Sequence, residues 1–112
     1  MFTHLHLHTE YSLLDATIRL SDLIQKLQDS GMKACAITDH GNMYGAYKFV
    51  SAMREAGLKP ILGCEIYIAP RGMDKKDFGI DNKYFHLVLL AKNLQGYKNL
   101  ANIVSIAHME GF

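Results

Sequence analysis

The chain of 112 residues has few cysteines, little net charge and no apolar run long enough to cross a membrane. Its two cysteines, Cys35 and Cys64, are too few and too far apart in the sequence for a disulfide framework. Both lie in apolar segments, where a free thiol behaves as a small hydrophobe. Because the predicted first strand begins directly after Met1, we expect no signal peptide. We therefore expect a reduced, cytoplasmic protein without membrane contacts.

The charges of the chain are balanced, with 12 basic and 11 acidic residues. This balance removes any bulk electrostatic argument for nucleic-acid binding, so contact with DNA would have to be local or made by further chain. A hydrophobic content of 49% over 112 residues suits one modest globular domain. Internal repeats and low-complexity tracts are absent from the sequence, which excludes repeat architectures.

The first fifteen residues carry the most distinctive pattern. In FTHLHLHTEYSLLD, histidines alternate with apolar residues, and a period of two is typical of a β-strand. On a strand, His4, His6 and His8 share one face, and Asp15 follows as a hard oxygen ligand. Engineered tags are consecutive histidines, and buried structural imidazoles each need a partner. This stretch therefore predicts a metal site.

The rest of the chain alternates between helical and strand patterns. Ser21 is a candidate N-cap, Gly31 a candidate C-terminal stop, and Tyr47, Val50 and Met53 form the expected buried stripe of the second helix. The order strand, helix, strand, helix, strand, loop, strand, helix is typical of an α/β fold with a parallel sheet, open or closed into a barrel. After the first strand, we expect helix 21–30, strand 33–38, helix 44–56, strand 59–69, loop 70–84, strand 85–91 and helix 94–109.

Chemically reactive residues follow the predicted strand ends, where active sites of such folds collect. His6 and His8 end the first strand, His40 follows the second, Glu65 lies along the third, and His86 lies early in the fourth. Histidine and carboxylate ligands together suit zinc, manganese or iron. A cluster of such ions activates water and holds a phosphoryl oxygen. The residues alone therefore indicate a metal-dependent hydrolase, most plausibly of phosphoesters.

Several segments are similar to a known family. The stretches HLHLHTEYSLLDA, ITDHGNMYG, KPILGCEIYIAP and HLVLLAKN resemble the polymerase and histidinol phosphatase (PHP) domain. More narrowly, they resemble the version at the N-terminus of the alpha subunits of bacterial replicative DNA polymerases. The resemblance covers the chain except the 70–84 loop. It implies a distorted seven-stranded α/β barrel, of which residues 1–112 would be the N-terminal part, about the first half, without the polymerase core.

The resemblance also implies a ligand set and a cofactor. Up to three divalent ions, zinc or manganese, would be bound in the intact domain. Asp39 would orient a histidine, and His4 would support the site without binding metal. The implied metal ligands are His6, His8, Asp15, His40, Glu65 and His86, and the implied catalytic residues are His6, His8, Asp15, Asp39, His40 and Glu65.

Two departures from the family pattern qualify this site. Ala16 stands where the family often has glycine, which is a minor change in the turn. The later family ligands, including an Asp-x-His pair, have no counterpart, because no aspartate follows Asp81. We therefore expect an incomplete metal site and an inactive isolated fragment. Unpaired sheet edges of a half barrel would also favour self-association.

The function implied by the resemblance is DNA replication as part of a DNA-directed DNA polymerase, a nucleotidyltransferase. The intact PHP domain would add metal-dependent 3′–5′ exonuclease activity. DNA, contacted through the polymerase part, and other replisome subunits would be the partners.

Three alternatives stay open at this point. The domain could be a scaffold in which metals act only as staples, or the chain could come from an error-prone paralogue. It could also be a stand-alone phosphatase of a small monoester such as histidinol phosphate, although GCEIYIAP and LLAKNLQGYKNL look like the polymerase branch. Tyr11, Tyr44 and Tyr47 are interpreted as packing aromatics rather than base-stacking platforms.

Overall fold

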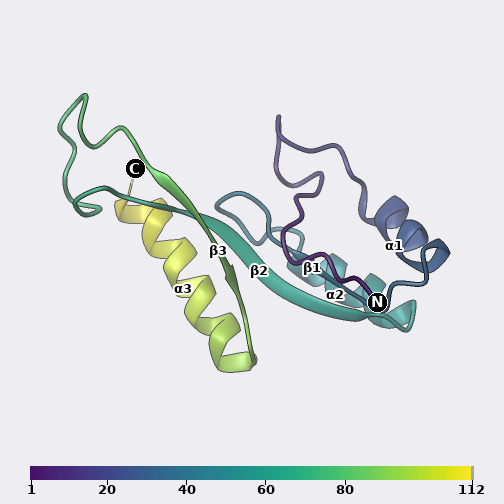
Figure 1. Cartoon of the computed structure of the whole chain (residues 1–112). Helices are drawn as coiled ribbons and strands as arrows, with labels where there is room; N and C mark the ends of the chain where they lie inside the picture. Colours follow the sequence, from purple (N-terminus) through teal and green to yellow (C-terminus); the bar gives the residue numbers. More distant parts are fainter. Residues whose placement is uncertain (112) are drawn as a thin grey trace.

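The computed structural model describes residues 1–111, and its helices and strands lie within two residues of the predicted bounds, apart from the expected first strand. Figure 1 shows the chain as a sheet with helices on its two sides. The predicted 70–84 loop contains no helix or strand among the described residues. The elements are α1 (Leu20–Asp29), β1 (Ala34–Ile37), α2 (Ala46–Glu55), β2 (Lys59–Ile68), β3 (Phe85–Leu90) and α3 (Leu94–Glu110).

The sheet has the order β1-β2-β3 and is mixed rather than parallel. β1 pairs with β2 in parallel, from Ala34 opposite Lys59 to Ile37 opposite Leu62. β3 pairs with β2 in the antiparallel direction, with Ile68 opposite Phe85. The parallel prediction was wrong for β3 because a loop, and not a crossover helix, joins it to β2, so the chain returns beside the strand it has just left.

The N-terminal segment lies along β1 but does not form the predicted strand (Figure 1). Only His4 makes a bridge, in parallel with Cys35, and the backbone bends at residues 5–6. Further along, the Leu7 amide donates to the Thr38 hydroxyl at 2.8 Å. Because a side chain takes the place of a carbonyl there, the regular ladder of a strand is not completed.

The hydrophobic core lies between α1, α2 and the first part of the sheet. It contains Phe49 and Met53 of α2, both fully buried, whereas Tyr47 is 83% exposed. The expected stripe of α2 was therefore wrong in Tyr47, and its buried residues are Ala46, Phe49 and Met53. The cluster of buried core residues is Leu20, Leu23, Leu27, Cys35, Ile37, Phe49, Met53 and Leu58.

Both cysteines are free and buried, as expected of core thiols. Burial raises the pKa of Cys35 to about 11, so its thiol stays protonated at neutral pH. The pKa of Cys64 is also raised to about 11, chiefly by burial. Neither thiol is therefore an activated nucleophile or a ready metal ligand.

The boundaries of α1 show one confirmed prediction and one wrong one. Gly31 has φ of +68°, and its amide donates to the carbonyl of Gln28, so it ends the helix as predicted. The helix begins at Leu20, before Ser21, and Arg19 holds the N-cap position without a side-chain hydrogen bond. Among the helices of residues 1–111, none is both long and apolar enough to cross a membrane.

β3 and α3 form the other side of the molecule, away from α1 and α2 (Figure 1). Asn93 caps α3 by accepting a hydrogen bond from the Gly96 amide at 2.9 Å. Leu100 is the only buried residue of this helix. The chain extends 48 × 29 × 23 Å with a radius of gyration of 15.3 Å, against about 13 Å expected for a packed domain of this length. The fold is therefore elongated.

Candidate metal centre

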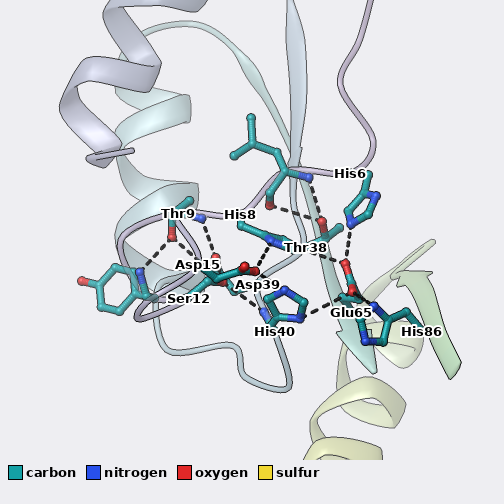
Figure 2. A network of polar contacts seen from close by, with 12 residues as sticks. His6, His8, Thr9, Ser12, Asp15, Thr38, Asp39, His40, Glu65 and His86 are labelled. Atoms are coloured by element: carbon teal, nitrogen blue, oxygen red, sulfur yellow. Dashed lines mark hydrogen bonds and ion pairs between the residues drawn. The ribbon is translucent and has the colours of Figure 1, made fainter. Parts of the chain in front are cut away.

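Glu65 of β2 is the centre of a cluster of imidazoles (Figure 2). Its Oε2 atom lies 2.8 Å from His8 Nε2 and also contacts His6 Nε2. Its Oε1 atom lies 2.8 Å from His86 Nδ1 and 3.5 Å from His40 Nδ1. The carboxylate is buried, so four imidazoles surround a single acidic group that water barely reaches.

Asp15 closes the other side of the cluster. Its Oδ2 atom lies 3.1 Å from His8 Nδ1 and also contacts His40 Nε2. His8 therefore faces Glu65 with one ring nitrogen and Asp15 with the other. Two groups of donor atoms, each within 4.8 Å of one another, result: His6, His8 and Glu65, and His8, Asp15 and His40.

Pairing of the strands explains how these distant residues meet. His40 follows β1 and forms a parallel bridge with Glu65 of β2. His86 lies opposite Tyr67 in the antiparallel pairing of β3 with β2. Because His86 is early in its strand, a parallel β3 would place it at the opposite end of the strands, away from Glu65. The antiparallel direction, which the sequence did not predict, is what brings His86 to Glu65.

Asp39 is buried behind the cluster and does not contact an imidazole, contrary to expectation. Its carboxylate accepts hydrogen bonds from the Thr9 amide at 2.6 Å, the Thr9 hydroxyl at 2.8 Å and the Ser12 hydroxyl at 2.7 Å. Ser12 Oγ in turn accepts from the His40 amide at 3.1 Å. Asp39 therefore holds the turn between His8 and Asp15, and acts on the histidines only through the backbone.

The residues that hold this turn were not identified from the sequence. Thr9 and Ser12 are buried polar residues directly after the histidine pattern. Asn42, also buried, donates to the carbonyls of Tyr11 and His40 at 3.1 and 2.9 Å. Their position beside the motif was the only indication in the sequence, because their bonding partners lie some 30 residues away.

His4 stands apart from the cluster. Its ring packs edge-on against Phe2, with 4.7 Å between centroids, and its carbonyl accepts from the Ala36 amide. Within the described part of the chain, it belongs to neither group of donor atoms. The expectation that all three histidines share one face was wrong, because the bends at residues 5–6 interrupt the alternation.

Electrostatics keep the central carboxylate ionised. Burial by itself raises the pKa of Glu65, but hydrogen bonds from His6 and His8 and the charge of His40 outweigh it. The pKa of Glu65 is therefore lower than its usual value of 4.5. A charged carboxylate at the centre of several imidazoles attracts a cation.

The imidazole and carboxylate donors of the cluster suit a divalent metal in two respects. The Nδ1 atom of His40 is buried and makes no hydrogen bond, although it faces Glu65 Oε1 at 3.5 Å. A buried nitrogen without a partner costs about 1–3 kcal/mol, and a cation between these two atoms would remove this cost. The mixture of imidazole and carboxylate ligands fits zinc, manganese or iron. The residues present therefore fit a metal.

Comparison with known proteins gives the family. The chain matches the family model of the PHP domain over residues 4–112. It is similar to DNA polymerase III subunit alpha of Borreliella burgdorferi, with 47% identity over 99% of this chain and 10% of the relative. The same subunit from Helicobacter pylori strain J99 is 48% identical over 99% of this chain and 9% of the relative. The chain thus spans about a tenth of the length of these relatives.

Solved structures agree on the fold. A protein from Bifidobacterium adolescentis that is named as a metal-dependent phosphoesterase has a TM-score of 0.59 and 24% identity, over 89% of this chain and 32% of that one. An amidohydrolase from Chromobacterium violaceum has a TM-score of 0.61 and 20% identity, over 90% of this chain and 32% of that one. The chain has the α/β fold of part of these proteins, and by its sequence match it belongs to the PHP domain family.

Proposed function

We propose that this chain is the N-terminal part of the PHP domain of a DNA polymerase III alpha subunit, and that its cluster of histidines and carboxylates serves metal-dependent phosphodiester hydrolysis. Identities of 47% and 48% with polymerase alpha subunits support the first part. The observation that carries the second part is the convergence of four imidazoles on the buried Glu65.

Some side chains of the cluster would hold ions, and the exposed ones mark the side from which a substrate would approach. Glu65, His8, Asp15 and His40 would hold the ions, with Asp39 fixing the turn that carries Asp15. Bound divalent ions would polarise a phosphoryl oxygen and lower the pKa of water. The side chains of His6 and His86 are 58% and 51% exposed, so a phosphodiester can approach on their side.

The finer parts of the proposal concern metal, partners and location. We propose zinc or manganese, with up to three ions in a complete domain and fewer here, because the later family ligands have no counterpart in this sequence. DNA and other replisome subunits would be reached through the polymerase part, in the cytoplasm. This chain alone would then be inactive, and hydrolysis would need the complete domain.

Metal titration of the full chain tests this proposal directly. We expect one or more Mn²⁺ or Zn²⁺ ions to bind, and Glu65→Gln to weaken the tightest site on the order of 100-fold, since loss even of outer partners costs 10–100-fold. His4→Asn is the matched control and should bind as the unchanged chain does. Hydrolysis of a 3′-labelled single-stranded oligonucleotide by the complete domain should stop after EDTA treatment. Equal hydrolysis with and without EDTA would contradict the metal mechanism.

A scaffold role is the second candidate, and one observation favours it. The proposed ligands come from the N-terminal segment, the residue that follows β1, and β2, so a metal would join three separate segments. In that case metal should raise the melting temperature of the chain, and His8→Asn should abolish this rise. A scaffold predicts this stabilisation without hydrolysis by the complete domain, whereas an enzyme predicts both stabilisation and hydrolysis.

A further inference from the structure

Two tyrosines lie beside the candidate metal ligands but are not themselves candidate ligands. Tyr67 is two residues beyond Glu65 on β2, so both side chains lie on the same face of the sheet. Tyr84 directly precedes β3. The two tyrosine rings lie 4.5 Å apart between centroids, and Tyr67 lies 5.0 Å from the ring of His86, its partner across the strands.

These rings are unlike core aromatics in their exposure. Tyr67 is 45% exposed and Tyr84 56% exposed, although they contact each other. Neither hydroxyl forms a hydrogen bond within residues 1–111. A pair that is packed only to fill the core would be buried, and a pair that acts through its hydroxyls would have polar partners. What remains available to a ligand is the flat apolar surface of the rings.

Each tyrosine ring is stacked on an imidazole ring of the cluster. Tyr84 and His86 are stacked, with 21° between their planes and 5.7 Å between centroids. Tyr67 and His40 are stacked in the same way, with 27° between planes and 6.2 Å between centroids. The tyrosine rings therefore lie directly beside His40 and His86, which face Glu65. A phosphate bound to ions that Glu65 and its neighbours would hold would carry its own nucleoside within reach of the tyrosines.

We propose that Tyr67 and Tyr84 form a stacking platform for a nucleobase of the single-stranded DNA whose phosphodiester lies at Glu65. This inference rests on the proposed function and adds how the substrate strand is recognised. Stacking on an aromatic ring accepts every base, because each base has a π-face. The net charge of +1 offers little electrostatic attraction for DNA, so stacking is the source of affinity that the chain has available.

Binding of matched oligonucleotides tests this platform without requiring catalysis. The probes are a fluorescein-labelled thymidine tetramer and an abasic tetramer with the same phosphates, both with cleavage-resistant phosphorothioate links, measured by anisotropy with the full chain and Mn²⁺. We expect the thymidine probe to bind at least about fivefold more tightly, given the usual strength of base stacking. Tyr67→Ala and Tyr84→Ala should reduce this ratio towards one, whereas Tyr67→Phe should keep it.

Tyr47→Ala provides the matched control, because Tyr47 is exposed on α2 and contacts no residue of the cluster. It should leave the ratio unchanged. Equal binding of both probes by the unchanged chain would overturn the inference, as would an equal loss in Tyr47→Ala. Base-dependent binding without any hydrolysis by the complete domain would keep the platform and reject the catalytic proposal. Hydrolysis by the complete domain, with equal affinity of this chain for both probes, would do the reverse.

Discussion

The side of the molecule that holds α1, β1 and α2 buries its apolar residues, whereas the side that holds β3 and α3 leaves most of them exposed. All buried hydrophobic residues except Cys64 and Leu100 lie between residues 20 and 58. On the other side, Phe85, Ile103 and Ile106 are exposed at 40% or more. We call these the packed region (residues 20–58) and the open region (residues 84–111).

The candidate site lies between the two regions and depends on both. His40 comes from the packed region, and Asp39 of that region fixes the turn between His8 and Asp15. Glu65 lies on the strand that joins the regions, and His86 is the contribution of the open region. The comparison teaches that buried hydrogen bonds position one part of this site, whereas strand pairing alone brings in His86.

The largest expected effect is a core truncation in the packed region. Phe49→Ala removes a fully buried ring and should lower the free energy of unfolding by about 3–5 kcal/mol. Ile103→Ala in α3 is the corresponding truncation in the open region and should cost only about 1 kcal/mol, since Ile103 is 41% exposed and loses fewer contacts than a fully buried residue. Urea unfolding measures both, and equal losses would contradict the division into two regions.

Next in size is the loss of the buried carboxylate behind the site. Asp39→Ala leaves the Thr9 amide and the Thr9 and Ser12 hydroxyls without their acceptor, and should cost about 3 kcal/mol. Metal affinity should fall with it, because the turn carries Asp15. Asn93→Ala removes the cap of α3 in the open region and should cost only about 1 kcal/mol. If metal binding by Asp39→Ala stayed unchanged, the turn would not depend on Asp39.

Acid should lower the stability that Glu65 contributes between the two regions. Glu65 has a pKa in the folded state below its usual value of 4.5. Its contribution to stability is therefore complete above pH 4.5 and is lost as the pH falls through the lowered pKa. The melting temperature without metal should drop as the pH falls below 4.5, and that of Glu65→Gln should drop less. An identical acid response in both proteins would exclude Glu65 as its origin.

The smallest effect is expected in the loop that leads into the open region. Arg71 binds Asp81 through Nε at 2.9 Å and Asp77 through a guanidinium nitrogen at 2.5 Å. The Arg71 guanidinium holds the pKa of Asp81 below its usual range. Because Arg71 is exposed, Arg71→Gln should change the free energy of unfolding little but should speed amide exchange in residues 70–84. Lys75→Gln is the control and should leave that exchange as it was.

Local patterns were sufficient for much of the fold. Apolar spacing predicted each helix to within two residues, and Gly31 ended α1 because glycine tolerates its positive φ. The same local logic failed at the N-terminus. Alternation of side chains describes which residues share a face, but a strand also needs backbone partners, and near Leu7 a Thr38 hydroxyl takes that role.

The candidate site was predicted through the family resemblance as a set of residues, but not as an arrangement. The structure brings His6, His8, Asp15, His40, Glu65 and His86 together, and their binding of metal stays a prediction. Self-association through unpaired sheet edges also stays a prediction. Tyr67 and Tyr84 were not singled out, because only their place beside the cluster gives them meaning.

By itself, the sequence determined the bounds of the helices and of β1, β2 and β3 to within two residues, which residue types cluster at strand ends, and the PHP family. Only the tertiary structure decided that the N-terminal segment forms no strand, that β3 runs antiparallel to β2, and that Asp39 holds the turn after His8. The physical reason is the separation in sequence over which each kind of interaction acts. Periodicity and capping act over a few residues, whereas strand direction and buried hydrogen bonds depend on contacts between residues far apart in the chain.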